Sequence, residues 1–105
     1  MKNRLEFKAE NKHIDIKIYG NIGRSWWDEE EKIENNVRNV NDLEQLLNEN
    51  KNSNTIDIFI NSTGGSVFEG VAIYNILKRH KAYKRVFIDG FACSIASVIA
   101  MAGNQ

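Results

Sequence analysis

Isoleucine occupies every second position in two segments of the chain, alternating with Asp15 and Lys17 in 14–18 and with Asp57 and Phe59 in 56–60. Because successive side chains of a strand point to opposite faces, this pattern is typical of a half-buried strand. We therefore expect one strand that ends near Gly20 and a second that delivers segment 61–65 at its C-terminal end. A further strand is expected over 85–89.

Between the strands, apolar residues recur at helical spacing. Asn41, with Glu44 three residues later, resembles a capping box and opens an expected helix that runs to about Asn50. A second helix is expected over 67–79 and a third, nearly apolar one over 94–102. The residues expected on the core-facing side of the second helix are Phe68, Val71, Ala72, Ile73, Ile76 and Leu77.

The order of these elements predicts the architecture. Leu5 and Phe7 indicate a short first strand, after which strands alternate with helices. Such alternation is typical of an α/β fold with a mainly parallel sheet and flanking helices. Open sheets of this kind place their sites at the C-terminal ends of strands. Gly64, Gly65 and Ser94 all follow expected strands, so we expect them to lie together.

Two polar segments of the chain give less information about structure or function. Residues 24–36 read as an acid-rich loop or short helix, and Trp26 and Trp27 within it are expected to pack on the core or on a neighbouring subunit. The one basic cluster follows the helix over 67–79, where a solvated helix cap is the expected role. Its members are Lys78, Arg79, His80, Lys81, Lys84 and Arg85.

Length and composition exclude several classes. The 105 residues predict a single small domain, 1–105, and the formal net charge of zero gives no reason to expect nucleic acid or an anionic membrane as a partner. One cysteine excludes an internal disulfide and fits a reducing compartment. No signal-peptide pattern opens the chain, and the longest apolar stretch, 91–102, is too short to span a bilayer. We expect a cytoplasmic protein, and no motif indicates a metal or another cofactor.

Two segments carry residues suited to catalysis. Ser94 opens the apolar helix, next to backbone N–H groups without intrahelical partners. Gly64 and Gly65 let the backbone adopt positive φ, so that an N–H can point at a developing oxyanion. Each feature also has a plainer interpretation, because Ser94 can be an N-cap and the glycine pair an ordinary turn.

Together these segments resemble the Clp protease proteolytic subunit family, within the Clp-protease/crotonase superfamily. That family has an Asn-Ser-Pro-Gly-Gly turn followed by a helix and, after another strand, a Gly-x-Ala-x-Ser stretch that carries the nucleophile. The matching segments here are 60–65, 70–74 and 90–103. The phage and prophage branch, often described as head-maturation proteases, is the most similar in wording over 65–70, 77–81 and 96–103.

The resemblance implies a serine endopeptidase that hydrolyses peptide bonds through an acyl-enzyme. Ser94 would be the nucleophile, and the backbone N–H groups of Gly65 and Ile95 would form the oxyanion hole. Gly64 would set the geometry of the turn. The implied substrate contacts are Ser66, Val67 and Phe68. The family further implies a polypeptide substrate, homo-oligomeric rings and a separate ATP-dependent unfoldase, in a bacterial or phage-infected cell.

The chain departs from the family pattern at two positions. Thr63 stands where the family usually has proline, which pre-sets a turn, so this turn is expected to be less rigid or differently shaped. Cys93 takes a place often filled by alanine. We expect Cys93 to be small and buried, and the motif register favours Ser94 as the nucleophile.

The general base is the larger departure. The family supplies a histidine and an aspartate after the nucleophile helix, and this sequence ends at Gln105. His80 closes the helix that starts at the glycine turn, which places it roughly 20 Å away. His13 precedes a strand whose far end approaches the turn. We therefore expect the N-terminal half of a Clp-type peptidase, inactive alone.

Other classes stay open. The main alternative is a catalytically dead assembly or interaction module of the same fold. A crotonase-type acyl-CoA enzyme would share the oxyanion-hole logic but would not need a serine at the place of Ser94. A lipase-like hydrolase is disfavoured because no Gly-x-Ser-x-Gly elbow surrounds Ser94.

Overall fold

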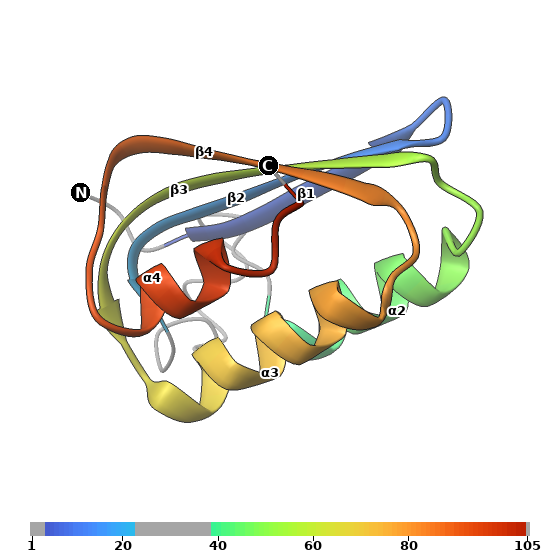
Figure 1. Ribbon diagram of the computed structural model, residues 1–105. Helices are drawn as coiled ribbons and strands as arrows, with labels where there is room; N and C mark the ends of the chain where they lie inside the picture. The colour runs from blue at the N-terminus through green and yellow to red at the C-terminus, as the bar shows by residue number, and fades with distance from the viewer. Residues whose placement is uncertain (1–3, 23–38, 105) are drawn as a thin grey trace.

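The computed structural model describes residues 4–22 and 39–104, which form a four-stranded sheet with helices on one face (Figure 1). The elements in chain order are β1 (Arg4–Glu10), β2 (His13–Ile22), α2 (Val40–Glu49), β3 (Thr55–Gly65), α3 (Val67–Arg79), β4 (Tyr83–Ala92) and α4 (Ile95–Ala100). The strand order is β1-β2-β3-β4, with β1 antiparallel to β2 and the other neighbours parallel. The expected α/β architecture is confirmed, whereas Trp26 and Trp27 lie outside the described residues.

The centre of the core is a double row of isoleucines from β2 and β3. All six are fully buried, because the alternating pattern turns each of them toward the helices. Burying one such side chain stabilises the fold by about 1.5–3 kcal/mol, so this row is a main source of stability. The pairs across the two strands are Ile14 with Ile56, Ile16 with Ile58, and Ile18 with Ile60.

Helix α3 has the expected bounds, but its buried face differs from the expected one. Gly70, Ile73 and Leu77 lie against the core, together with Ile76. Phe68 is 90% exposed and Val71 is exposed as well, so their assignment to the core is wrong. The physical reason is that α4 packs closely against α3. At the contact between the two helices only glycine fits, so Gly70 faces α4 there.

Helix α2 begins two residues before the expected start. The capping box uses Asn39, whose side-chain oxygen accepts the Asp42 N–H at 3.0 Å, while the Asp42 carboxylate accepts the Asn39 N–H at 3.0 Å. The expected pair Asn41 and Glu44 is wrong, since both residues lie inside the helix and are exposed.

Other element ends also moved. β2 continues past Gly20 to Ile22 through a register shift, which lets β3 keep pairing as far as Gly65. The glycine pair is therefore the end of a strand rather than a separate turn. β4 is longer at both ends than the expected 85–89, and α4 ends at Ala100.

The basic cluster after α3 is not simply a solvated cap. Lys84 is 5% exposed, and its ammonium group donates to the backbone carbonyls of His80 and Ala82. Burial lowers the pKa of Lys84. Arg85 points to the other face of the sheet and binds the Asp57 carboxylate. These two residues therefore have structural partners, while Arg79 contacts Glu44 at the surface.

Candidate active site

The site expected from the sequence lies at the C-terminal ends of β3 and β4, which are parallel neighbours. Ser62 of β3 pairs with Ala92 of β4, and the Cys93 N–H donates to the Ser62 carbonyl at 3.1 Å. These contacts draw the chain from the end of β4 toward the end of β3. The strand order therefore brings the glycine pair and Ser94 to the same edge of the sheet.

Gly64 shows how closely the two segments meet. A Cβ built at Gly64 would lie 2.8 Å from the Cys93 carbonyl oxygen, 2.8 Å from Ser94 Cβ and 3.5 Å from Ser94 Oγ. The backbone of Gly64 also has φ of 96°, and that of Gly65 has φ of 144°, conformations that favour glycine. The predicted juxtaposition of Gly64 and Ser94 is therefore confirmed, and both the space and the backbone require glycine at position 64.

Ser62 holds the glycine pair in place, a role that the sequence did not indicate. Its side chain is fully buried, and its hydroxyl donates to the Gly20 carbonyl at 2.5 Å while it accepts the Gly64 N–H at 3.0 Å. The hydroxyl thus connects β2 to the end of β3. A serine at an inward-facing strand position was the available signal, because a buried hydroxyl needs partners.

Ser94 is exposed and has an unusual backbone conformation, with φ of 55° and ψ of −127°. Its side chain makes no capping hydrogen bond to α4, so the plainer interpretation of Ser94 as a side-chain N-cap is wrong. Positive φ at a non-glycine residue costs about 1–3 kcal/mol and persists only where the surroundings impose it. Here the contact with Gly64 and the packing of Ile95 impose it.

Ile95 fixes α4 against α3. Its side chain is 7% exposed, and a Cβ built at Gly70 would lie only 2.2 Å from Ile95 Cγ1. Glycine at position 70 therefore lets the two helices approach. Since Ile95 directly follows Ser94, this contact also positions the serine and the backbone N–H of Ile95.

The three expected substrate contacts divide into two kinds. Ser66 is the N-cap of α3, and its hydroxyl accepts the Glu69 N–H at 3.3 Å. Val67 is 61% exposed and Phe68 90% exposed, so both present apolar surface at the start of α3. Of the three expected contacts, Val67 and Phe68 therefore have side chains exposed enough to touch a peptide, whereas the Ser66 hydroxyl is occupied as a helix cap.

A family model described as Clp protease matches residues 29–105. The chain belongs to the Clp protease family.

Curated relatives within the Clp protease family include ATP-dependent Clp protease proteolytic subunits of two bacteria. The protein of Deinococcus radiodurans is 37% identical over 60 residues, which are 57% of this chain and 29% of that protein. The protein of Streptococcus pyogenes is 36% identical over 75 residues, which are 70% of this chain and 38% of that protein. The chain thus spans less than half the length of these relatives.

Solved structures of Clp proteases are also similar to this chain. The ClpP1 N165D mutant from Listeria monocytogenes matches with a TM-score of 0.65 and 26% identity over 85% of this chain and 46% of that one. The ClpP protease catalytic domain from Plasmodium falciparum matches with a TM-score of 0.58 and 31% identity over 85% of this chain and 45% of that one. A protein from a dehydratase/decarboxylase enzyme couple, 13% identical with a TM-score of 0.56, shares the fold alone. Because this fold hosts different chemistries, the side chains decide the activity.

Neither histidine of this Clp family member lies beside Ser94. His80 Nε2 donates to the Asn50 carbonyl at 2.9 Å and its Nδ1 accepts the Ala82 N–H at 3.0 Å, so both ring nitrogens are engaged. His13 pairs with Thr55 at the start of β3. The seven residues from Thr55 to the Ser62 level of the site correspond to about 23 Å of strand. The expectation that both are remote from the site is confirmed.

Cys93 is exposed, so its expected burial is wrong. The turn out of β4 carries both Cys93 and Ser94 to the surface. No helix within the described residues is long and apolar enough to cross a membrane.

Proposed function

We propose that this chain provides the nucleophile half of a Clp-type serine endopeptidase site. The observation that carries the proposal is the contact between Gly64 and Ser94, which places an exposed hydroxyl against a strand end that only glycine can form. Ser94 attacks the peptide carbonyl and forms the acyl-enzyme. Membership of the Clp protease family supports a hydrolase that acts on polypeptides.

The oxyanion of the tetrahedral intermediate is bound by backbone N–H groups of Gly65 and Ile95. Ile95 begins α4, and the first N–H groups of a helix have no intrahelical acceptor. Gly64 sets the direction of the following peptide unit through its φ of 96°. Removing one such donor typically costs about 100- to 1,000-fold in kcat.

The peptide substrate lies along the start of α3. Val67 and Phe68 supply exposed apolar contacts, and the end of β3 supplies backbone pairing next to the glycine pair. The Ser66 hydroxyl contributes indirectly, because it caps α3 and so fixes where these two residues begin.

The general base comes from outside these 105 residues. A serine hydroxyl needs a base within hydrogen-bond reach, and the two histidines of the sequence lie elsewhere in the fold. The 105-residue chain alone therefore has little or no peptidase activity. Assembly into rings, a separate ATP-dependent unfoldase, a cytoplasmic location and a phage origin remain predictions from the resemblance.

Chemical rescue tests the proposal. Free imidazole supplies the missing base, and intact-mass spectra follow the attachment of a fluorophosphonate to the chain. We expect a single adduct whose rate rises with imidazole concentration in the unmodified chain and in Ser97→Ala, and no adduct in Ser94→Ala. Ser97 is the matched control, since it is an exposed serine one helical turn along the same segment, and its hydroxyl donates only to the Ser94 backbone carbonyl, at 2.6 Å. An adduct that survives Ser94→Ala, or a rate that does not respond to imidazole, contradicts the proposal.

A catalytically dead assembly module is the second candidate, and the exposed apolar side chains favour it. Phe68, Met101 and Val67 are 90%, 70% and 61% exposed, and Ile88 on the last strand of the described sheet is 48% exposed. Large exposed apolar groups mark interaction surfaces. Light scattering that shows a defined oligomer, combined with no Ser94 adduct in imidazole, would favour this candidate over the peptidase.

A further inference from the structure

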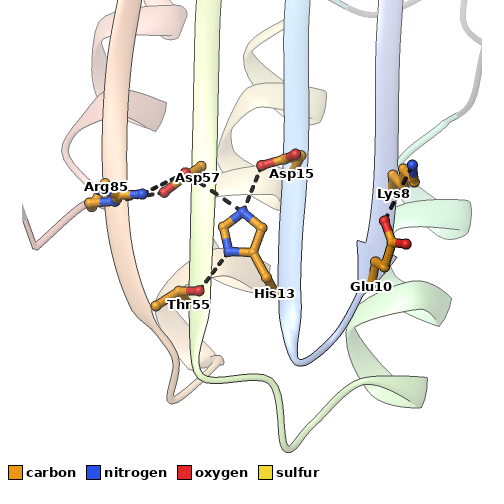
Figure 2. A network of polar contacts seen from close by, with 7 residues as sticks. All are labelled: Lys8, Glu10, His13, Asp15, Thr55, Asp57 and Arg85. Atoms are coloured by element: carbon orange, nitrogen blue, oxygen red, sulfur yellow. Dashed lines mark hydrogen bonds and ion pairs between the residues drawn. The ribbon is translucent and has the colours of Figure 1, made fainter.

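A second polar cluster lies at the opposite end of the sheet from Ser94. It consists of His13, Asp15 and Asp57, whose ligand atoms all lie within 4.8 Å of one another (Figure 2). Ile14, Ile16, Ile56 and Ile58 are buried against the helices, so the alternate positions that carry the cluster lie on the opposite face of the sheet, as Figure 2 shows. The cluster lies outside the proposed peptidase site and shares no residue with it.

Strand register assembles the cluster. Asp15 of β2, Asp57 of β3 and Arg85 of β4 stand side by side in one row, and His13 stands beside Thr55 two residues earlier. Residues two apart on a strand share a face, so all five side chains point the same way. Two carboxylates directly opposite each other repel, which makes a cation between them favourable. The sequence could not reveal the cluster, because its members come from strands far apart in the chain.

His13 is oriented as a ligand. Its Nδ1 lies 2.6 Å from the Thr55 hydroxyl, which fixes the ring, and its Nε2 faces Asp15 Oδ1 at 2.8 Å and Asp57 Oδ2 at 3.6 Å. Ionised carboxylates only accept hydrogen bonds, so an electropositive centre has to lie between Nε2 and these oxygens. A proton on Nε2 can fill that role, and so can a metal ion. Metal-binding histidines commonly hold their second nitrogen in such a hydrogen bond.

The spacing fits a small transition-metal ion. Ligand atoms about 2.1 Å from a tetrahedral Zn²⁺ lie about 3.4 Å apart, close to the 3.6 Å between His13 Nε2 and Asp57 Oδ2. The 2.8 Å between His13 Nε2 and Asp15 Oδ1 is a hydrogen-bond distance and has to widen when the ion enters. Asp57 is held rigidly, since Arg85 donates to both of its oxygens at 2.8 Å. Asp15 is about half exposed, with 48% of its side chain accessible, so it can turn to admit the ion.

We propose that His13 Nε2, Asp15 and Asp57 form a binding site for a divalent cation of the zinc class, with water in the open coordination positions. The imidazole favours zinc-type ions over Mg²⁺ or Ca²⁺, which prefer all-oxygen sites. The bound ion fastens β2 to β3 where both strands begin. Arg85 opposes binding through its nearby positive charge, so the site is weaker than the same ligands without it.

Titration of the full chain with Zn²⁺ tests the site. Affinity is measured by competition with a chromophoric chelator, and long-range ¹H–¹⁵N spectra report on the histidine side-chain nitrogens. We expect one Zn²⁺ per chain and a large shift of His13 Nε2, while His80 serves as the internal control. Asp15→Asn should weaken binding more than about 10-fold, and Thr55→Val, which releases the ring, about 10-fold. Arg85→Gln should tighten it.

The matched control is Asp89→Asn, the same substitution on the same sheet face at the other end, where Asp89 binds Tyr19. Binding should be unchanged in this variant. The proposal is overturned if Asp15→Asn and Asp57→Asn bind Zn²⁺ as the unmodified chain does, or if Cys93→Ser abolishes binding. A dissociation constant above about 1 mM overturns it as well.

Discussion

The packing of Gly70 against Ile95 holds the segment that carries Ser94, and the substitution Gly70→Ala perturbs it directly. In an open helix, replacing glycine by alanine stabilises by about 1 kcal/mol. Here the new methyl group would lie 2.2 Å from Ile95 Cγ1 and 3.2 Å from Cβ and Cγ2. A buried β-branched side chain cannot swing away, and overpacking typically costs about 1–3 kcal/mol. The clash cancels or outweighs the gain, so we expect no stabilisation and a net loss of up to about 2 kcal/mol.

A double-mutant cycle isolates this contact. Ile95→Ala alone should cost about 2–5 kcal/mol, because it removes buried methyl groups and leaves a cavity. In the Gly70→Ala background the same change removes the clash, and the added methyl fills part of the cavity. The double variant should therefore be more stable than the sum of the single changes by about 1–3 kcal/mol.

Urea unfolding followed by circular dichroism, at one protein concentration, measures the four free energies of unfolding. Asn75→Ala on the exposed side of α3 controls for helix propensity and should be neutral or slightly stabilising. If Gly70→Ala stabilises the chain as Asn75→Ala does, or if the cycle is additive within about 0.3 kcal/mol, α4 does not pack on Gly70. The placement of Ser94 would then be wrong too.

Three further predictions concern the strand end, the cap of α2 and the outer sheet face. Gly64→Ala should cost more than about 1 kcal/mol from backbone strain alone and should slow the imidazole-dependent labelling, since its Cβ would lie against the Cys93–Ser94 backbone; unchanged stability and labelling would contradict this. Asn39→Ala should lower the free energy of unfolding in urea by about 0.5–2 kcal/mol, because it removes the N-cap of α2, whereas Asn41→Ala should not lower it. If Asn41→Ala destabilised the chain more than Asn39→Ala, Asn41 would be the cap, as the sequence pattern had indicated. The hydrogen bond to Asp89 raises the pKa of Tyr19 above its ordinary value of 10.0, so its contribution to stability is complete below pH 10 and is lost as pH rises through the higher folded value. Tyrosinate absorbance should show the late titration of Tyr19, and Asp89→Asn should lower the pKa of Tyr19 toward its ordinary value.

The recurrence of isoleucine at every second position was sufficient to predict β2 and β3, because a strand with one buried face requires a period of two. Apolar residues at helical spacing likewise predicted α3 with the bounds that it has in the structure. The meeting of the glycine pair and Ser94 at the C-terminal ends of parallel strands also followed from the order of elements, and the contact between Gly64 and Ser94 confirms this juxtaposition. The resemblance to the Clp protease family rests on two motifs that are local in sequence, and the family model that matches residues 29–105 confirms it.

Contacts between distant segments decided the rest. The buried face of α3 depends on where α4 lands, so helical periodicity alone assigned Phe68 and Val71 wrongly to the core.

The role of Ser62 and the cluster of His13, Asp15 and Asp57 arise from strand register, which pairs residues that are far apart in the sequence. Local patterns report which face of an element is apolar, and only the packed structure determines what each face meets.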